Sequence, residues 1–218
     1  MKSLRTKTSR RTGGFSLLEM AMVLALIIIM ATISFMSLQP MLRQQRVNNA
    51  YNTVLGAMRQ ARDNSVAQRT SYVVTLDSTT TPHSVTVAPT FVGPQGIQGT
   101  VSYTLPTDVT FNVVSGIPTA PTKTPDGFGV GAKAIDFGYT GAGTGVGGKN
   151  QIYFCPDGSA QDSAGGIGQC TGNMNNGVVY IARPTELMSS RAITIWGATG
   201  RIRGWRIYNN GGVAWQRQ

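Results

Sequence analysis

The sequence contains only one histidine, His83, and only two cysteines, Cys155 and Cys170. A single histidine makes a Ser/His/Asp catalytic triad improbable, and no G-x-S-x-G motif or carboxylate cluster takes its place. The two cysteines are too far apart for the Cys-x-x-Cys unit of a zinc site. Asp157 and Asp162 lack the regular ladder of ligands that a calcium loop needs. We therefore expect no catalytic residue, no metal site and no cofactor.

Acidic residues are scarce: nine Asp and Glu stand against 19 Lys and Arg, and the net charge is +10. Much of this excess lies in the first 14 residues, which contain five basic side chains and no acid. The five are Lys2, Arg5, Lys7, Arg10 and Arg11. A basic segment ahead of an apolar run stays on the cytoplasmic side of a membrane. The pI of 10.1 therefore overstates the signal for nucleic-acid binding.

One long apolar run covers residues 15–38 and contains a single charge, Glu19. As a helix it would be about 36 Å long, enough to cross a hydrocarbon core of about 30 Å. It is too long for a cleaved secretory signal, and a plain signal anchor leaves the carboxylate unexplained. A carboxylate in an apolar span is costly and needs a cationic partner. A cut between Gly14 and Phe15 would supply one, because the new α-amine lies four residues before Glu19.

Residues 13–20 (GGFSLLEM), behind the short basic leader, resemble the class III signal of type IV pilins and pseudopilins. The resemblance implies that a prepilin peptidase cuts after Gly14 and N-methylates Phe15. It also implies that Glu19 pairs with the N-terminal amine of a neighbouring subunit as the filament grows. The expected location is the bacterial inner membrane, with a single span and an extracytoplasmic C-terminal domain, and then the filament. The expected partners are the peptidase, the inner membrane and other pilins or pseudopilins.

After the apolar run, Pro40 predicts a kink rather than the end of the helix, because proline removes one backbone donor. Apolar residues then recur at spacings of three and four, which predicts an amphipathic helix with one face on a core. This stripe consists of Val47, Tyr51, Val54, Met58, Ala61 and Ser65. Several arginines lie mostly off the stripe and are interpreted as a solvated face: Arg43, Arg46, Arg59, Arg62 and Arg69. Helical character fades near residues 69–70, where β-branched residues begin.

The rest of the chain alternates like strands separated by Gly, Pro and Thr turns. The predicted strands are 72–76, 84–88, 101–103, 109–114, 134–137, 151–154, 177–181, 191–196 and 201–208. Two stretches, 118–131 and the glycine-rich 138–150, are predicted as irregular loops, because the second lacks the ending of a phosphate-binding loop. The expected class is α+β, a long N-terminal helix on an antiparallel sheet, which is the pilin fold. The expected segments are a leader (1–14), a transmembrane and filament-core helix (15–39), an amphipathic helix (40–70) and a β-rich domain (71–218).

The single-span topology places Cys155 and Cys170 outside the cytoplasm, where two cysteines predict one disulfide. A closed loop of about 15 residues would stabilise the fold by roughly 3 kcal/mol in the chain-entropy model. The bond would tie down residues 156–169, which have little apolar content of their own.

Three further stretches resemble FimT/GspH-type minor pilins and pseudopilins: residues 58–69 (MRQARDNSVAQR), 152–160 (IYFCPDGSA) and 200–203 (GRIR). In FimT-type competence pilins the GRxR motif contributes to DNA binding, which implies that role for Arg201 and Arg203. In an extended strand these two would project from one face about 7 Å apart. A bulge at Gly204 would bring Arg206 onto the same surface.

The arginines of this motif also have a structural interpretation. An edge strand can carry arginines that deter aggregation or bridge to neighbouring subunits, and GRxR also occurs in GspH-type secretion pseudopilins, where DNA is not the expected cargo. The sequence therefore predicts a structural subunit of a type IV pilus or of a type II secretion pseudopilus. DNA binding for uptake in natural transformation is a possible added role of the first, and a pseudopilin without DNA binding is the alternative.

Overall fold

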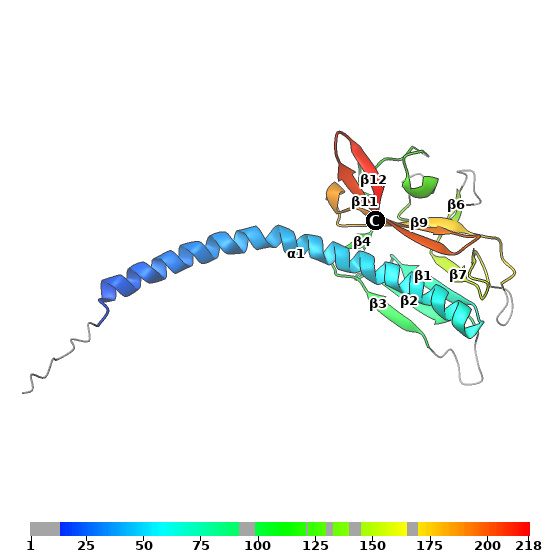
Figure 1. Ribbon diagram of the computed structural model, residues 1–218, viewed down its shortest axis with the longest axis horizontal. Helices are drawn as coiled ribbons and strands as arrows, with labels where there is room; N and C mark the ends of the chain where they lie inside the picture. Colours follow the sequence, from blue (N-terminus) through cyan, green and yellow to red (C-terminus); the bar gives the residue numbers. More distant parts are fainter. Residues whose placement is uncertain (1–13, 92–98, 121, 130–132, 140–144, 165–169) are drawn as a thin grey trace, which may run out of the picture. The chain divides into compact units, whose positions relative to one another are not determined.

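The computed structural model describes residues 14–91, 99–120, 122–129, 133–139, 145–164 and 170–218. Contacts within the chain group into two units, Met1–Arg43 and Gln44–Gln218. Helix α1 (Leu17–Gln68) contributes to both units, and every described strand belongs to the second (Figure 1). All strand pairs are antiparallel. The α+β class predicted from the sequence is therefore confirmed.

In the first unit, α1 begins at Leu17 and continues without a break into the second unit. Pro40 lies inside α1, so the helix continues through the proline, as the sequence predicts. Two hydroxyls of the apolar stretch bond back to the preceding turn: Thr32 donates to the Ile28 carbonyl (2.7 Å) and Ser34 to the Met30 carbonyl (2.9 Å). Such bonds satisfy polar side chains without any partner outside the helix.

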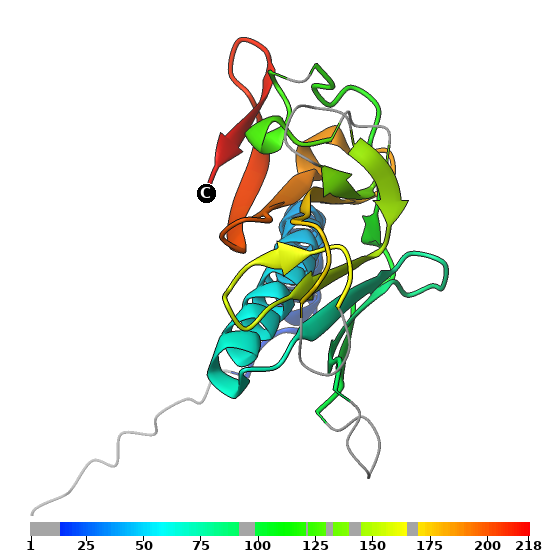
Figure 2. The same ribbon diagram turned by 90° about the vertical axis from the view of Figure 1, so that its right-hand side faces the viewer.

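In the second unit, α1 lies along the sheets (Figure 2). One stripe of its side chains is buried in the core that it shares with them. All six residues of the predicted stripe are buried: Val47, Tyr51, Val54, Met58, Ala61 and Ser65. The interpretation of the arginines as a solvated face holds for Arg46, Arg59 and Arg69, which are exposed, whereas Arg62 is half-buried. The helix ends at Gln68, and Arg69 follows with a positive φ of 52°, close to the predicted end.

Two antiparallel sheets complete the second unit. The first has the strand order β3-β2-β1-β7-β8. Its strands are β1 (Tyr72–Asp77), β2 (Ser84–Pro89), β3 (Val101–Thr104), β7 (Gln151–Phe154) and β8 (Ala160–Gln161). Buried and half-buried residues alternate along β1 and β2, which is typical of strands with one face on a core.

The second sheet has the order β12-β11-β10-β9-β5-β6, and β4 also pairs with β9. Its strands are β4 (Thr110–Phe111), β5 (Ile135–Tyr139), β6 (Gly145–Lys149), β9 (Asn176–Ala182), β10 (Arg191–Trp196), β11 (Arg201–Asn209) and β12 (Val213–Arg217). Two 3-10 turns accompany them, η1 (Pro125–Gly127) and η2 (Leu187–Ser189).

Both faces of this second sheet are covered. One face joins α1 and the first sheet in the main core. On the other face a smaller apolar cluster forms around Tyr180, Ile207 and Trp215, with Ile117 and Phe128 from the segment before β5. Strands β9 and β10 are therefore buried along nearly their whole length instead of alternating, as expected for strands that are covered on both sides.

The predicted strand boundaries differ from the structure at a few places. The loop predicted at 138–150 is wrong in part, because β5 extends to Tyr139 and the glycine-rich β6 pairs with it. The strand predicted at 109–114 is only Thr110–Phe111. Strands β8 and β12 were not predicted at all. Strand β6 pairs with β5, and its glycine-rich sequence carries no side-chain alternation that would have predicted a strand.

Candidate functional site

The first candidate region is the exposed start of α1. Ser16 caps the helix: its hydroxyl accepts the N–H of Leu18 (3.3 Å) and its carbonyl accepts the N–H of Met20 (3.1 Å). Glu19 lies in the first turn, where a negative charge complements the helix dipole. Ser16 and Glu19 thus have the spacing of a capping box, a sequence signal that was missed. Gly14 and Phe15 precede the helix, so the predicted cleavage site lies in non-helical, exposed backbone. The leader residues 1–13 lie outside the described residues.

The side chains that follow Phe15 are apolar and exposed. Large apolar residues between Phe15 and Leu42 are exposed from 46% at Val23 to 92% at Leu17. Among the described residues, Glu19 forms no ion pair and no side-chain hydrogen bond. By length and composition, α1 can cross a membrane. The apolar stretch of this unit therefore has no cover from its own described residues, and its single carboxylate has no intramolecular partner there.

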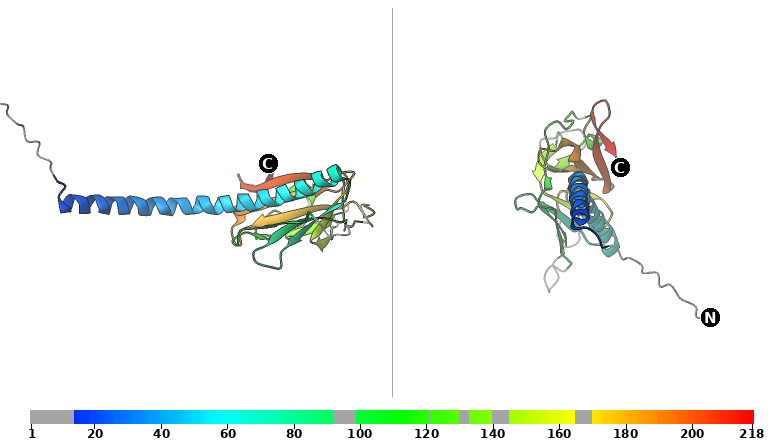
Figure 3. Two further views of the ribbon diagram at one scale, coloured as in Figure 1. Left: turned by 90° about the horizontal axis from the view of Figure 1, so that it is seen from below. Right: turned by 90° about the vertical axis from the view of Figure 1, so that its left-hand side faces the viewer.

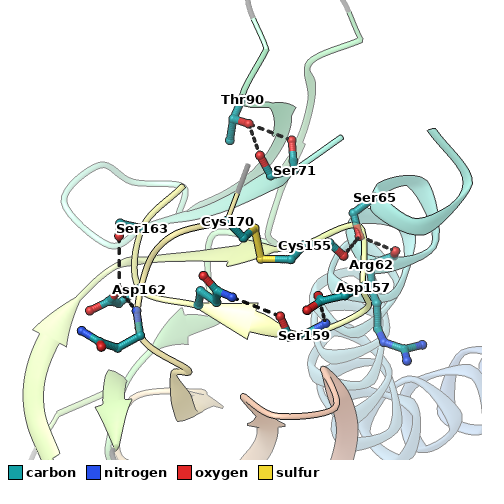
Figure 4. Close-up of a disulfide and its surroundings, with 12 residues drawn as sticks. Arg62, Ser65, Ser71, Thr90, Cys155, Asp157, Ser159, Asp162, Ser163 and Cys170 are labelled. Atoms are coloured by element: carbon teal, nitrogen blue, oxygen red, sulfur yellow. Dashed lines mark hydrogen bonds between the residues drawn. A yellow bond between two sulfur atoms is a disulfide. The ribbon is translucent and has the colours of Figure 1, made fainter. Parts of the chain in front are cut away.

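The second candidate region is a junction in the globular unit, where residues 58–69, 152–160 and 200–203 meet. Figure 4 shows part of it, with Ser65 of α1 beside Cys155. The hydroxyl of Ser65, on α1, donates to the Cys155 carbonyl (3.0 Å). That carbonyl also accepts the N–H of Gly158 (2.8 Å), which closes the turn after β7. A Cβ at Gly200, just before β11, would collide with the carbonyl oxygen of Gly158. The glycine that opens GRIR is therefore required for close packing of two backbone turns.

Arg62 links the same elements from the helix side. Its guanidinium donates to the Thr199 carbonyl (3.2 Å), in the turn between β10 and β11. Cys155 and Cys170 form the predicted disulfide, which closes a loop between two residues that are 15 apart in the sequence. In the chain-entropy model a loop of this size stabilises the fold by about 3 kcal/mol. The junction thus fixes the base of the β10–β11 turn against α1.

Beside this junction lies an open groove of about 730 Å³, which we call the arginine groove. Four arginines line it, two from α1 and two from β11: Arg59, Arg62, Arg201 and Arg203. Asp63 and Trp196 contribute to the same wall. Arg201 and Arg203 therefore do lie on one surface, as predicted. The proximity of Arg59 and Arg62 to this surface was not predicted, because only the fold brings the helix beside the strand (Figure 3, left).

The two arginines of the GRIR motif differ in their contacts. The guanidinium of Arg201 is exposed and has no hydrogen bond or ion pair with any described residue. Arg203 instead forms an ion pair with Asp126, and its guanidinium lies 5.4 Å from the Trp196 ring centroid. The Asp126 carboxylate also accepts from Thr194 and from the Trp196 indole. Arg203 is thus largely neutralised by its own chain, and Arg201 is the available cation of the pair.

The expectation that Arg206 joins this surface is wrong. The β10–β11 register runs without interruption through Gly204, so the strand has no bulge there. A Cβ at Gly204 would overlap the Tyr51 hydroxyl on α1, so this glycine serves close packing of helix and strand. Because side chains alternate along a strand, Arg206 points to the α1 side and Arg203 to the other. Between them in sequence, Trp205 donates its indole N–H to the Thr194 hydroxyl (3.0 Å).

Two further charged side chains at these sites were not predicted from the sequence. Asp126 follows Pro125 in η1, where a Pro-Asp-Gly turn is a visible signal, but its contact with Arg203 spans 77 residues. Arg191 begins β10 and is fully buried, and no sequence pattern marks it. Burial, and then the charge of Arg206, lower the pKa of Arg191 to about 10.

The remaining polar residues considered from the sequence have structural roles. His83, expected in a polar turn, is buried, and its Nδ1 accepts the N–H of Phe111 (2.9 Å). Asp157 and Asp162 each accept a backbone N–H, from Ser159 (2.8 Å) and Asn173 (2.9 Å) respectively. Within the described ranges, no three His, Cys, Asp or Glu side chains gather as a metal site would require. Comparisons with protein-family models, with curated proteins and with solved structures find no match for this chain.

Proposed function

We propose that this chain is a minor pilin or pseudopilin, a structural subunit of a type IV pilus or a type II secretion pseudopilus. The observation that carries the proposal is the start of α1, an apolar stretch exposed on all sides with a single carboxylate, Glu19, in its first turn. A long apolar helix with no cover from its own chain is stable in lipid or in a bundle of similar helices. The proposed path is insertion in the inner membrane followed by incorporation into a filament.

Processing between Gly14 and Phe15 by a prepilin peptidase is the first step of this proposal. The capped helix begins only after Ser16, which leaves the bond in a non-helical segment that a peptidase can bind. The cut creates an α-amine four residues before Glu19. An ion pair between that amine and Glu19 of a neighbouring subunit would remove two poorly solvated charges together, which favours docking in one register.

Mass spectrometry of the chain purified from membranes tests processing. We expect a mature protein that starts at N-methylated Phe15. Gly14→Val should abolish the cut without affecting the fold, because no atom lies within 4 Å of a Cβ at Gly14. A mature wild-type chain that starts at Met1 would overturn the proposal.

Filament assembly tests the role of Glu19. Glu19→Gln removes the charge while keeping the shape, so cleavage should remain normal and incorporation into filaments should be lost. Sheared filaments probed for this subunit give the readout. Wild-type incorporation of the Gln variant would contradict an ion pair in assembly.

DNA contact through the arginine groove is a second candidate function, favoured by the four arginines that two separate elements bring together. Arg201 would be the main contact, because Asp126 occupies Arg203. Binding by one subunit should be weak and salt-sensitive, since few phosphates are neutralised. Retardation of duplex DNA by the full mature chain in detergent should fall in Arg201→Gln and persist in Arg206→Gln, an equal charge change on the other side of β11. Equal retardation by wild type and Arg201→Gln would instead favour a pseudopilin without DNA binding.

A further inference from the structure

Arg191 of β10 and Arg206 of β11 are directly opposite each other in the antiparallel ladder. Directly opposed residues of two strands project from the same face of the sheet, with Cβ atoms about 5 Å apart. Like charges in this arrangement destabilise a sheet. This pair lies on the α1 face, where Arg191 donates to the Asn48 side chain (3.0 Å). It is distinct from the arginine groove, which opens beside Arg201.

The partners of Arg191 do not neutralise its charge. The side chain is fully buried, and its guanidinium donates to the Ser189 and Ser190 carbonyls (3.2 and 3.1 Å) as well as to Asn48. All of these acceptors are uncharged, and its Nε has no hydrogen-bond partner. Buried charges in proteins are normally paired with an opposite charge. Here the nearest charged neighbour along the ladder, Arg206, is of the same sign.

Arg206 is the accessible member of the pair. It is half-buried, and its guanidinium lies 5.2 Å from the Tyr208 ring centroid. Among the described residues its guanidinium forms no hydrogen bond and no ion pair. A guanidinium carries five N–H donors in a rigid fork that matches the oxygens of a phosphate. The stacking on Tyr208 holds this fork without using those donors.

We propose that Arg206, with Arg191 as a fixed positive charge behind it, binds an oxyanion of the phosphate class. The bound anion would supply the negative charge that the two opposed arginines lack. The source that fits best is an anionic phospholipid headgroup. Asn48, which contacts Arg191, lies on α1 ten residues beyond Leu38, the end of the apolar run. This choice of source rests on the proposed membrane insertion of α1, whereas the oxyanion site itself does not.

Lipid retention by the full mature chain in a neutral detergent tests the proposal. Short-chain phosphatidylglycerol, phosphatidylcholine and inorganic phosphate are the three probes, and native mass spectrometry counts the retained lipid. We expect phosphatidylglycerol to be retained well above phosphatidylcholine. Arg206→Gln should reduce that retention about tenfold, as loss of a charge-assisted contact does. Arg206→Lys should keep part of it, and Arg201→Gln, with the same change in net charge, should keep all of it.

Thermal unfolding of the same proteins is a second measurement, and it distinguishes anion binding by Arg206 from a purely structural role of this residue. Without any anion, Arg206→Gln should unfold at the same temperature as wild type or higher, because it relieves the repulsion of Arg191. Added phosphatidylglycerol should raise the midpoint of wild type and leave that of Arg206→Gln unchanged.

The outcomes separate the sources of the anion. If inorganic phosphate gives this protection and phosphatidylglycerol does not, the oxyanion site stands and the membrane source is overturned. If no probe distinguishes Arg206→Gln from Arg201→Gln, the proposal is overturned. Loss of filament incorporation by Arg206→Gln, with no change toward any probe, would overturn it in favour of a carboxylate on another subunit. Lipid retention and thermal protection are measured on the isolated chain and do not depend on filament assembly, so they can fail while the mature chain still starts at Phe15.

Discussion

The two stretches of α1 belong to one continuous helix, yet their side chains meet different surroundings. From residue 44 onward the helix buries a stripe of six residues and exposes most of its arginines. From Leu17 to Leu42 the large apolar side chains are exposed on every side. One helix can therefore be suited to two environments. Packing against the chain's own sheets requires only one apolar stripe, whereas lipid or a helix bundle favours apolar side chains all round the helix.

Insertion of a charge into each stretch should give the largest effect. Val54 is fully buried in the globular unit, so Val54→Asp should lower its free energy of unfolding by about 4 kcal/mol or more. Leu24→Asp, in the exposed apolar stretch, should change that free energy by less than about 0.5 kcal/mol. It should instead reduce the membrane-inserted fraction. Thermal unfolding by circular dichroism and membrane fractionation measure the two results. Equal destabilisation by both variants would remove the distinction between the stretches.

An intermediate effect is expected from two glycines that differ in what surrounds them. A methyl group at Gly204 would overlap the Tyr51 hydroxyl, so Gly204→Ala should destabilise the globular unit by about 2 kcal/mol. Gly56 lies in α1 with nothing within 4 Å of a Cβ, so Gly56→Ala should stabilise by about 0.5–1 kcal/mol. The shift of the denaturant midpoint, at an unchanged dependence of the unfolding free energy on denaturant concentration, gives both changes in stability. A neutral Gly204→Ala would show that helix and strand are not in close contact there.

The smallest effect concerns pH and is confined to the globular unit. Burial lowers the pKa of His83 from 6.5, and its Nδ1 already accepts a hydrogen bond from Phe111. The unfolded chain therefore binds a proton that the folded one does not, and stability should fall as the pH drops below about 6.5. In His83→Gln, the plot of unfolding free energy against pH should lose this fall below pH about 6.5. Burial raises the pKa of Asp136, which contributes in the opposite direction, and that contribution should remain in the variant. An identical pH profile in both proteins would contradict this assignment.

Local and periodic features of the fold could be predicted from the sequence. The apolar run, the stripe from Val47 to Ser65 and the end of the helix near Arg69 follow from spacing and composition. The disulfide follows from the presence of only two cysteines. Strand β12 had a signal that was missed, since the Gly211-Gly212 pair between two apolar segments is typical of a hairpin.

Contacts between distant segments could not be predicted. The alternation of side chains along a strand predicts that Arg201 and Arg203 lie on one face. The position of Arg206 depends on whether the strand has a bulge at Gly204, and the pairing of β11 with β10 shows that it has none. Asp126 reaches Arg203 across 77 residues of sequence. The β6 strand is held by pairing with β5 and carries no pattern of its own.

The sequence alone determined a helix with an apolar first half and an amphipathic second half, because helix periodicity and hydrophobicity are properties of neighbouring residues. It also determined that Glu19 is the only charge in the apolar run. Only the tertiary structure decided which arginines are free. Arg203 is neutralised by Asp126, Arg201 is left open, and Arg206 opposes the buried Arg191. Charge pairing depends on distances across strands and turns, and those distances exist only once the chain is folded.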